Sequence, residues 1–384
     1  MSLPKSVDAQ SRTVRLDAAI DLALSEKRIV GAVVFVAENG KIAYRRAAGL
    51  ADREAGRAMQ ENAIFRLASI TKPLVSAVVM RLVEQGVLDL DYPVTRWLPN
   101  FRPRLRDESS SPEILLRHLL THTSGLSYRF LEAPEHIYHA LNISDGLDQP
   151  GLAIDKNLER LALAPLSFSP GSTWRYSLGI DVIGEVVAIA SGLSLPTLVQ
   201  RYVTDPLEMR DTGFSVVDME RLVPAYFDGA GEPVRMNDGT WVPFYGSAAQ
   251  FAPSRILDPR SYPSGGAGMA GTAEDILRFL ETIRTGGGDI LATATVDTMT
   301  SDQVGSQAET QGPGWGFGYG WAVLSNKSVA HTPQAAGTIQ WGGAYGHYWF
   351  VDRENGLTAV SLTNTAFEGM SGAFPWQIRD AIYG

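Results

Sequence analysis

The sequence predicts an α/β (α+β) fold: an antiparallel sheet flanked by helices, with a mainly helical domain inserted in the middle. Strand-like runs joined by an Asn-Gly pair occur near both ends of the chain, at Asn39-Gly40 and at Asn355-Gly356. Asn-Gly between two apolar runs is a strong signal for a tight hairpin. Helical patterns flank these runs, and the region between them is rich in proline and glycine. We therefore expect one sheet built from both ends of the chain.

The chain of 384 residues, 45% of them hydrophobic, is long enough to bury a large core. In the middle of the chain, proline-rich loops alternate with helical runs and strand-like runs are sparse, unlike at its two ends, and this change predicts two domains. A discontinuous α/β domain comprises residues 1–87 plus 264–384. A mainly helical inserted domain comprises residues 88–263. We expect the functional site to lie between the two.

The first part of the chain is typical of a helix followed by a hairpin. Residues 14–27 carry apolar side chains at helical spacing. An apolar run at residues 33–36 leads into Asn39-Gly40, and a second run follows at residues 42–44. This pattern predicts two strands joined by a two-residue turn.

The next predicted element is a long apolar helix from Ile70 to Gln85, which ends at Gly86. Pro73 lies near its start, and proline is tolerated only in the first turn of a helix. Ser69 is therefore expected at, or just before, that first turn.

The remaining elements follow from the same patterns. In the middle of the chain, helices are predicted at residues 112–120, 157–163, 180–190 and 195–202, and strand alternation is sparse. Strands are predicted again at residues 338–352 and 357–364, and a closing helix at residues 374–383. The glycine-rich segment 312–320 is predicted to be a loop, because it lacks the lysine and the strand-to-helix context of a phosphate-binding loop.

Ser69 and Lys72 form the first motif that carries chemistry. A serine hydroxyl needs a base to act as a nucleophile at neutral pH. Residues three apart on a helix share a face, so the Lys72 amine can reach the Ser69 hydroxyl. The start of a helix also favours negative charge on that oxygen. A Ser-x-x-Lys pair alone is common by chance, and its place at the start of a long apolar helix is what gives it weight.

Two further motifs complete the pattern. Tyr176 follows a segment rich in turn-forming residues. A tyrosine beside a lysine can relay the serine proton. Trp341, Gly342, Gly343 and Ala344 lie in a strand-like run. Paired glycines let a backbone approach a substrate closely, and the edge of such a strand can supply an oxyanion N–H.

Together these segments resemble the serine beta-lactamase and penicillin-binding-protein-like superfamily over nearly the whole chain. The resemblance rests on FRLASITKP around Ser69, LLRHLLTHTSGL, PGSTWRYS, PSGGAGMAGTAEDI and GTIQWGGAYGHYWFVD. It implies a beta-lactamase-like sandwich, a serine hydrolase activity and no cofactor.

Two departures from that pattern indicate which branch of the superfamily the chain resembles. Class C beta-lactamases carry Tyr-x-Asn at the second motif, where this chain has Leu178, and Lys-Thr-Gly at the third, where it has Trp341-Gly342-Gly343. The Trp-Gly-Gly pattern is similar to that of family VIII carboxylesterases, and most similar to bacterial members that deacetylate cephalosporins. A cation at position 341 would pair with the carboxylate of a beta-lactam, whereas Trp341 offers an apolar wall. The lost charge-assisted contact is worth roughly 1.5–3 kcal/mol.

The resemblance assigns a role to each of these residues. Ser69 is implied as the nucleophile, and Lys72 and Tyr176 as the base system. The backbone N–H groups of Ser69 and Ala344 are implied as the oxyanion hole. The residues implied to bind the substrate are Trp341, Gly342, Gly343 and Tyr128.

The sequence gives little support to other kinds of catalytic site. The Gly-x-Ser-x-Gly elbow of α/β hydrolases is absent. His118 and His122 have a metal-compatible spacing, but no glutamate follows His118, and we interpret both as structural. His347 is interpreted as a packing residue. Asp181 is interpreted as a charge at a helix start, although it could also bias the site electrostatically.

Composition excludes several classes of partner. The net charge of −9 argues against nucleic acid and anionic membranes. The chain has no cysteine, so neither a disulfide framework nor a thiol nucleophile is expected. The N-terminal residues lack the apolar run of a signal peptide, and no apolar stretch has transmembrane length. We expect a cytoplasmic enzyme with a small-molecule ester substrate and neither a metal nor another cofactor. The sequence does not indicate the oligomeric state.

The sequence thus predicts a serine carboxylesterase that hydrolyses short-chain esters through an acyl-enzyme on Ser69, with cephalosporin deacetylation as one reaction. Three alternatives stay open. One is a beta-lactamase or a D-alanyl-D-alanine carboxypeptidase. Another is an acyltransferase that passes the acyl group to an alcohol other than water. The third is a binding protein without activity, against which the retention of Ser69, Lys72 and Tyr176 argues.

Overall fold

The computed structural model of the chain describes residues 5–106, 110–244 and 246–384. An eight-stranded sheet forms its centre, with the order β10-β11-β12-β13-β14-β1-β2-β3 and antiparallel pairing throughout. Its strands are β1 (Gly31–Glu38), β2 (Lys41–Asp52), β3 (Arg57–Ala58), β10 (Trp315–Phe317), β11 (Ala322–Leu324), β12 (Ile339–Gly343), β13 (His347–Asp352) and β14 (Leu357–Thr363). The predicted antiparallel sheet is confirmed.

The two ends of the chain meet in the middle of this sheet. Strand β1 lies between β2 and β14, and Val33 is paired with Leu362. The β1–β2 turn is the predicted two-residue turn, with Asn39 at φ 51° and Gly40 at φ 82°. Two positive φ angles match the right-handed twist of the flanking strands. The second predicted hairpin, β13–β14, also forms, but its connection spans residues 353–356.

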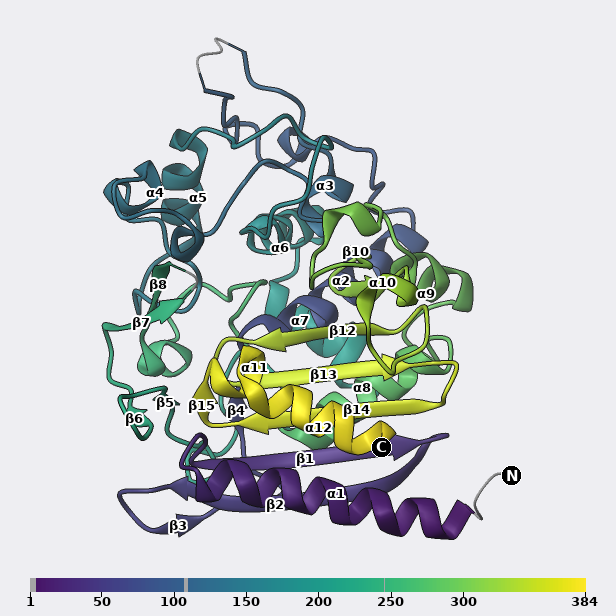
Figure 1. Cartoon of the computed structure of the whole chain (residues 1–384). Coiled ribbons are helices and arrows are strands. Elements are labelled where there is room, and N and C mark those ends of the chain that lie inside the picture. Colours follow the sequence, from purple (N-terminus) through teal and green to yellow (C-terminus); the bar gives the residue numbers. More distant parts are fainter. Residues whose placement is uncertain (1–4, 107–109, 245) are drawn as a thin grey trace.

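Helices cover both faces of the sheet (Figure 1). Helices α1 (Lys5–Ser25) and α12 (Ala373–Tyr383) lie side by side across one face. Helices α2 (Thr71–Glu84), α8 (Ala273–Arg284) and α9 (Thr293–Thr300) lie behind the other. In β1, Val34 and Val36 pack toward α1 and α12, whereas Val33 and Phe35 join the larger core on the opposite face. The strand is an unbroken apolar run because both its faces are covered.

The middle of the chain forms a mainly helical part, which lies above the sheet in Figure 1. Its α-helices are α3 (Leu116–Leu120), α4 (Ile137–Ala140), α5 (Ile154–Leu163), α6 (Gly179–Ser191) and α7 (Leu195–Val199). Short 3-10 turns are η2 (Val94–Arg96), η3 (Arg129–Leu131) and η5 (Pro253–Leu257), and η4 (Gln200–Thr204) is one turn of π-helix. Helix α6 packs against α2, which joins this part to the helices behind the sheet.

Short strands and turns complete the fold. They are β4 (Phe65–Arg66), β5 (Tyr226–Phe227), β6 (Val234–Arg235), β7 (Thr240–Phe244), β8 (Ser247–Phe251), β9 (Ala270–Gly271), β15 (Thr365–Ala366), η1 (Ala68–Ile70), η6 (Ser306–Ala308), α10 (Lys327–Ala330) and α11 (Glu368–Ser371). The division into residues 1–87 plus 264–384 and residues 88–263 stays a prediction. Within the described residues no single helix is long and apolar enough to cross a membrane, although α6 with α7 and η4, bent by 83°, passes on length and composition.

Three sequence-based expectations were wrong in detail. The predicted helix at residues 112–120 begins only at Leu116, because Leu115 is extended. The glycine-rich segment 312–320 is not a continuous loop, since β10 forms within it and pairs with β11. The hairpin β7–β8 was not expected in the middle region, where small residues such as Ala248 and Ala249 weaken the alternation that marks a strand.

Candidate active site

Ser69 lies where the sequence predicted, in the 3-10 turn η1 immediately before α2. The preceding residue, Ala68, has a φ of 45°, which is an uncommon conformation for a residue with a side chain. Pro73 occupies the first turn of α2, where its missing N–H leaves no hydrogen bond unmade. Ser69 is partly exposed, and it lines a large cavity.

Lys72 is completely buried one turn farther along α2. Its Nζ lies 3.1 Å from Ser69 Oγ and donates to the carbonyl oxygen of Gly266 at 2.8 Å. The same nitrogen lies 4.7 Å from the ring centre of Tyr176 and 5.3 Å from that of Tyr128. The amine is therefore held at the serine by one carbonyl and two aromatic faces.

Tyr176 reaches the serine from the loop that precedes α6. Its hydroxyl donates to Ser69 Oγ at 2.7 Å, across a separation of 107 residues in sequence. Trp341 lies on the other side, with its Nε1 3.4 Å from the Tyr176 hydroxyl. The structure thus brings together the predicted residues Ser69, Lys72, Tyr176 and Trp341.

The ring of His122 packs against the ring of Tyr176, a contact that the sequence did not indicate. The two rings meet edge to face with centres 4.8 Å apart, and the backbone N–H of Ser177 donates to His122 Nδ1 at 3.2 Å. Burial lowers the pKa of His122 well below its ordinary value, helped by the nearby charge of Lys72. A neutral imidazole thus packs against the tyrosine.

The end of β12 forms the opposite wall. A Cβ on Gly343 would lie 2.4 Å from the carbonyl oxygen of Leu67, so only glycine lets this strand approach the segment that carries the serine. Ala344 follows directly and lines the same cavity as Ser69. Gly342 also lines it. This places the predicted oxyanion residues on two walls of one cavity.

The cavity has a volume of about 760 Å³, which is the size of pockets that hold drug-sized ligands. Aromatic side chains dominate its walls: Tyr128, Phe130, Trp174, Phe244, Trp341 and Phe367. Tyr128 is stacked on Phe130 and lies 4.9 Å from Tyr176, ring centre to ring centre. The pocket therefore suits a largely apolar ligand, and Tyr128 lines it as predicted.

One cationic side chain, Arg175, lies among the described residues that line the cavity. It is already engaged, because its guanidinium contacts a Glu132 carboxylate oxygen at 2.6 Å and Ser127 Oγ at 2.9 Å. A substrate carboxylate would have to compete with Glu132 for it. This agrees with the loss of the lysine that beta-lactamases carry at the Trp341 position.

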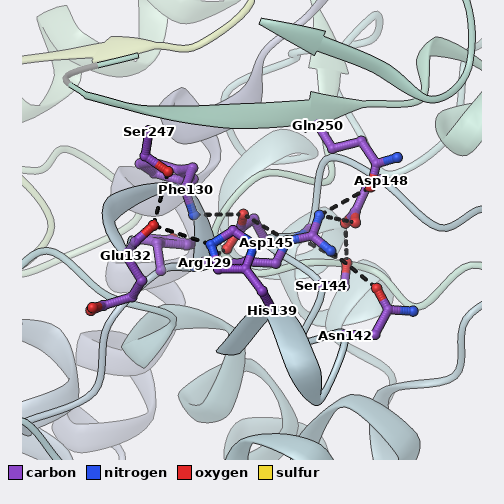
Figure 2. A network of polar contacts seen from close by, with 12 residues as sticks. Arg129, Phe130, Glu132, His139, Asn142, Ser144, Asp145, Asp148, Ser247 and Gln250 are labelled. Atoms are coloured by element: carbon purple, nitrogen blue, oxygen red, sulfur yellow. Dashed lines mark hydrogen bonds and ion pairs between the residues drawn. The ribbon is translucent and has the colours of Figure 1, made fainter. Parts of the chain in front are cut away.

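A buried polar network holds the wall that contains Phe130, as Figure 2 shows. The guanidinium of Arg129 contacts Asp148 at 2.6 Å, and Asp145 accepts the backbone N–H groups of Arg129 and Phe130 at 2.6 and 3.2 Å. Arg129 also donates to Gln250 on β8 at 3.2 Å. The network ties the pocket wall to the β7–β8 hairpin above it.

Asp145 is the titratable member of this network that lines the cavity. Burial raises its pKa to about 8, with Asp148 adding to the rise and the Arg129 charge opposing it. Arg129, Asp145 and Asp148 belong to none of the motifs in the sequence. Their spacing is irregular, and only the folded loop brings them together.

A further histidine lies beside the end of β12, where a Cβ on Gly343 would lie 3.0 Å from the ring of His347. His347, at the start of β13, is buried, and its Nε2 donates to the carbonyl oxygen of Arg66 at 2.7 Å. Burial lowers its pKa to about 4. Among the described residues no group of histidine, aspartate and glutamate side chains could hold a metal ion.

The fold and this geometry define a class of protein. Residues 16–382 match the family model described as Beta-lactamase. The chain therefore belongs to the beta-lactamase family, and the family predicted from the sequence is confirmed.

Individual relatives place it within that family. The chain is 57% identical to Esterase EstB from Burkholderia gladioli, over 98% of this chain and 97% of that protein. It is 27% identical to lovastatin esterase from Penicillium rubens, over 90% of this chain and 91% of that protein. Among solved structures it is similar to EstCE1, described as a hydrolase with promiscuous acyltransferase activity, with a TM-score of 0.96, 48% identity and coverage of 98% and 100% of the two chains.

Proposed function

We propose that this chain forms an acyl-enzyme on Ser69 and uses Lys72 and Tyr176 as its base system. At the level of reaction class, the chain is a serine ester hydrolase, as its 57% identity to an esterase over 98% of its length indicates. The observation that supports the finer proposal is the pair of contacts at Ser69 Oγ, 2.7 Å from the Tyr176 hydroxyl and 3.1 Å from Lys72 Nζ.

The proposed reaction has two halves. Ser69 Oγ attacks the ester carbonyl carbon, and its proton passes to the Tyr176–Lys72 pair. The tetrahedral intermediate then collapses, the bond to the alcohol oxygen breaks, and the pair returns the proton to the departing alkoxide. In the second half, water gives a proton to the pair and attacks the acyl-enzyme, and the acid leaves as Ser69 recovers its proton.

Negative charge develops on the carbonyl oxygen in both halves. The N–H groups of Ser69 and Ala344 are the proposed donors to this oxygen. Ser69 lies in the 3-10 turn η1 that leads directly into α2, so its N–H lies near the positive N-terminal end of that helix. This part of the proposal rests on the common cavity that both residues line.

The proposed substrate is an ester of a short acyl group with a large, mostly apolar alcohol. A cavity of about 760 Å³ far exceeds the volume of an acetyl group, so most of it would hold the leaving alcohol. A cephalosporin that carries an acetate ester fits this description, and its deacetylation is the reaction that we propose. Because Arg175 is paired with Glu132, ring opening of the lactam would lack a free cationic partner for the substrate carboxylate.

Acyl transfer is the second candidate. The observation in its favour is the likeness to EstCE1, a hydrolase with promiscuous acyltransferase activity. An apolar, aromatic pocket would favour an organic alcohol over water as the acceptor. Product analysis with a competing alcohol separates the two reactions, because transfer yields a new ester and hydrolysis yields only the acid. Turnover of a chromogenic cephalosporin by ring opening would instead favour the beta-lactamase alternative.

The decisive experiment measures the hydrolysis of a short-chain p-nitrophenyl ester by the wild type and by Ser69→Ala. We expect Ser69→Ala to lose activity while its circular dichroism spectrum and Tm stay those of the wild type. Equal rates for the two proteins would refute the assignment of the nucleophile. The cytoplasmic location stays a prediction.

A further inference from the structure

Asp181 is a buried carboxylate behind the amine of Lys72. It lies in the first turn of α6, as the sequence predicted, and it is only 3% exposed. A carboxylate at such a depth needs compensation. The groups that contact Asp181 therefore indicate what it does.

The two oxygens of Asp181 have different surroundings. Oδ1 accepts the hydroxyl of Ser264 at 2.5 Å. Oδ2 accepts no side-chain hydrogen bond within the described residues and lies against the backbone of Gly266, whose N–H helps to keep the carboxylate ionised. The buried hydroxyl of Tyr128 has no hydrogen-bond partner within the described residues. A Cβ on Gly266 would lie 2.4 Å from Asp181 Oδ2 and 2.9 Å from the Tyr128 hydroxyl. Asp181 Oδ2 and the Tyr128 hydroxyl oxygen therefore both face the backbone of Gly266.

Gly266 connects Asp181 to the catalytic amine. Its carbonyl oxygen accepts from Lys72 Nζ at 2.8 Å, while its Cα lies against Asp181 Oδ2. Any side chain at this position would push the two apart, which gives the glycine a reason beyond backbone conformation. Asp181 and Lys72 thus lie on the two sides of one residue.

Lys72 is a buried amine with no ion pair among the described residues. Its polar contacts are to Ser69 and Gly266, both uncharged. A protonated amine in such a place needs a counter-charge, because desolvation otherwise drives it to lose its proton. Asp181 is the buried carboxylate that interacts electrostatically with it.

We infer that Asp181 is a positioning residue that supplies the counter-charge of Lys72 across Gly266 and thereby sets the pH at which the base system works. This inference rests on the proposed function of Ser69 and Lys72. Its negative charge favours the ammonium form of Lys72, the form that exists after the pair has taken the proton of Ser69. Asp181 does not touch the reacting atoms.

Other titratable and charged groups face this pair. Burial raises the pKa of Asp181, and the Ser264 hydrogen bond and the charges of Lys72 and Arg255 oppose that rise. Burial also raises the pKa of Tyr128 well above its ordinary value, so it stays protonated. The groups that face Lys72 or Asp181 from neighbouring elements are His122, Tyr128, Tyr176, Arg255 and Tyr262.

The test is the pH profile of kcat/KM for Asp181→Asn with a p-nitrophenyl ester. Asparagine keeps the shape and an acceptor for Ser264, but it removes the charge. Without that charge the ammonium form is less stable, so the free base persists to lower pH, and we expect the acidic limb to move down by about one pH unit. A lower kcat/KM with an unmoved limb would mean a merely structural role and would overturn the inference.

Asp275→Asn is the matched control. Asp275 is also a buried carboxylate in the first turn of a helix, and it accepts the Thr212 hydroxyl at 2.9 Å, but it lies on α8, and the charges that act on it are those of Asp211 and Arg278. Its replacement should leave the acidic limb where it is. A limb that moved equally in both variants would contradict the inference.

Ser264→Ala keeps the test decisive if Asp181→Asn does not fold. Loss of the Ser264 hydrogen bond weakens the ionised form of Asp181, so the limb should move in the same direction by a smaller amount. An unmoved limb in this variant would overturn the inference. The proposed nucleophile fails on a different result, which is full activity of Ser69→Ala.

Discussion

The hydroxyl of Tyr176 donates to Ser69 Oγ at 2.7 Å, although the two residues are 107 positions apart in the chain. Tyr176 comes from the mainly helical middle of the chain and Ser69 from the start of α2, which packs against α6. The relative position of α2 and α6 therefore sets the distance on which proton transfer depends.

Tyr176→Phe should retain the fold and lose about 10²- to 10⁴-fold in kcat, the usual contribution of general acid–base catalysis. Lys72→Ala should lose a similar amount. Because both act on the same proton, we expect the double variant to be little worse than either single variant, as steady-state kinetics will measure. Losses that multiply would show that the two residues act independently.

Gly343→Ala should reduce kcat and also lower the Tm, because the clash is with buried backbone. The added methyl group would lie 2.4 Å from the Leu67 carbonyl oxygen, so β12 must move away from the segment that carries Ser69. Gly213→Ala is the matched control, because a Cβ at Gly213 meets nothing within 4 Å. Equal activity of both variants would argue against a close fit between β12 and the serine.

His347 should make the free energy of unfolding depend on pH. Its pKa is about 4 in the fold against 6.5 for an unperturbed histidine, so the unfolded chain binds more protons between these values. The contribution of His347 to stability is therefore complete above pH 6.5 and falls as the pH drops toward 4, by roughly 3 kcal/mol in all.

Urea unfolding at several pH values measures this effect. His347→Gln should show a weaker loss of stability between pH 6.5 and 4 than the wild type. His331→Gln, which changes an exposed histidine, should follow the wild type. Parallel curves for all three proteins would contradict the buried, neutral state of His347.

Arg129→Ala should lower the free energy of unfolding by about 3–5 kcal/mol, because it leaves Asp148 buried without its partner. Arg260→Ala breaks an exposed pair with Asp258 and should leave the Tm unchanged. The Tm of each variant, measured by thermal unfolding, checks the contrast. A small change for Arg129→Ala would show that water reaches this network.

The main elements of the fold could be predicted because local patterns specify them. Asn39-Gly40 adopts the turn that its residue types favour, and Pro73 marks the start of α2. The β7–β8 hairpin could not be predicted, because its small side chains give no clear alternation of apolar and polar residues along the strands. Its position depends on tertiary contacts, such as the one between Gln250 and Arg129.

The same contrast holds for the site. Ser69, Lys72, Tyr176 and Trp341 lie in motifs, and the structure places them within contact of one another. His122 and Asp181 lie near motifs but act through burial, which one sequence does not reveal. The Arg129 network has no motif at all, and its members meet only after the loop folds.

The pairing of β1 with β14 has a consequence for how the enzyme comes into being. The hairpin that is synthesised first must wait for the last strand before the sheet can close, and contacts of this range make folding slow. Ala344, which directly follows β12, belongs to the same late part of the chain as β14. A growing chain on the ribosome would therefore carry its serine and lysine long before it could use them, and the appearance of esterase activity would time the closure of the sheet.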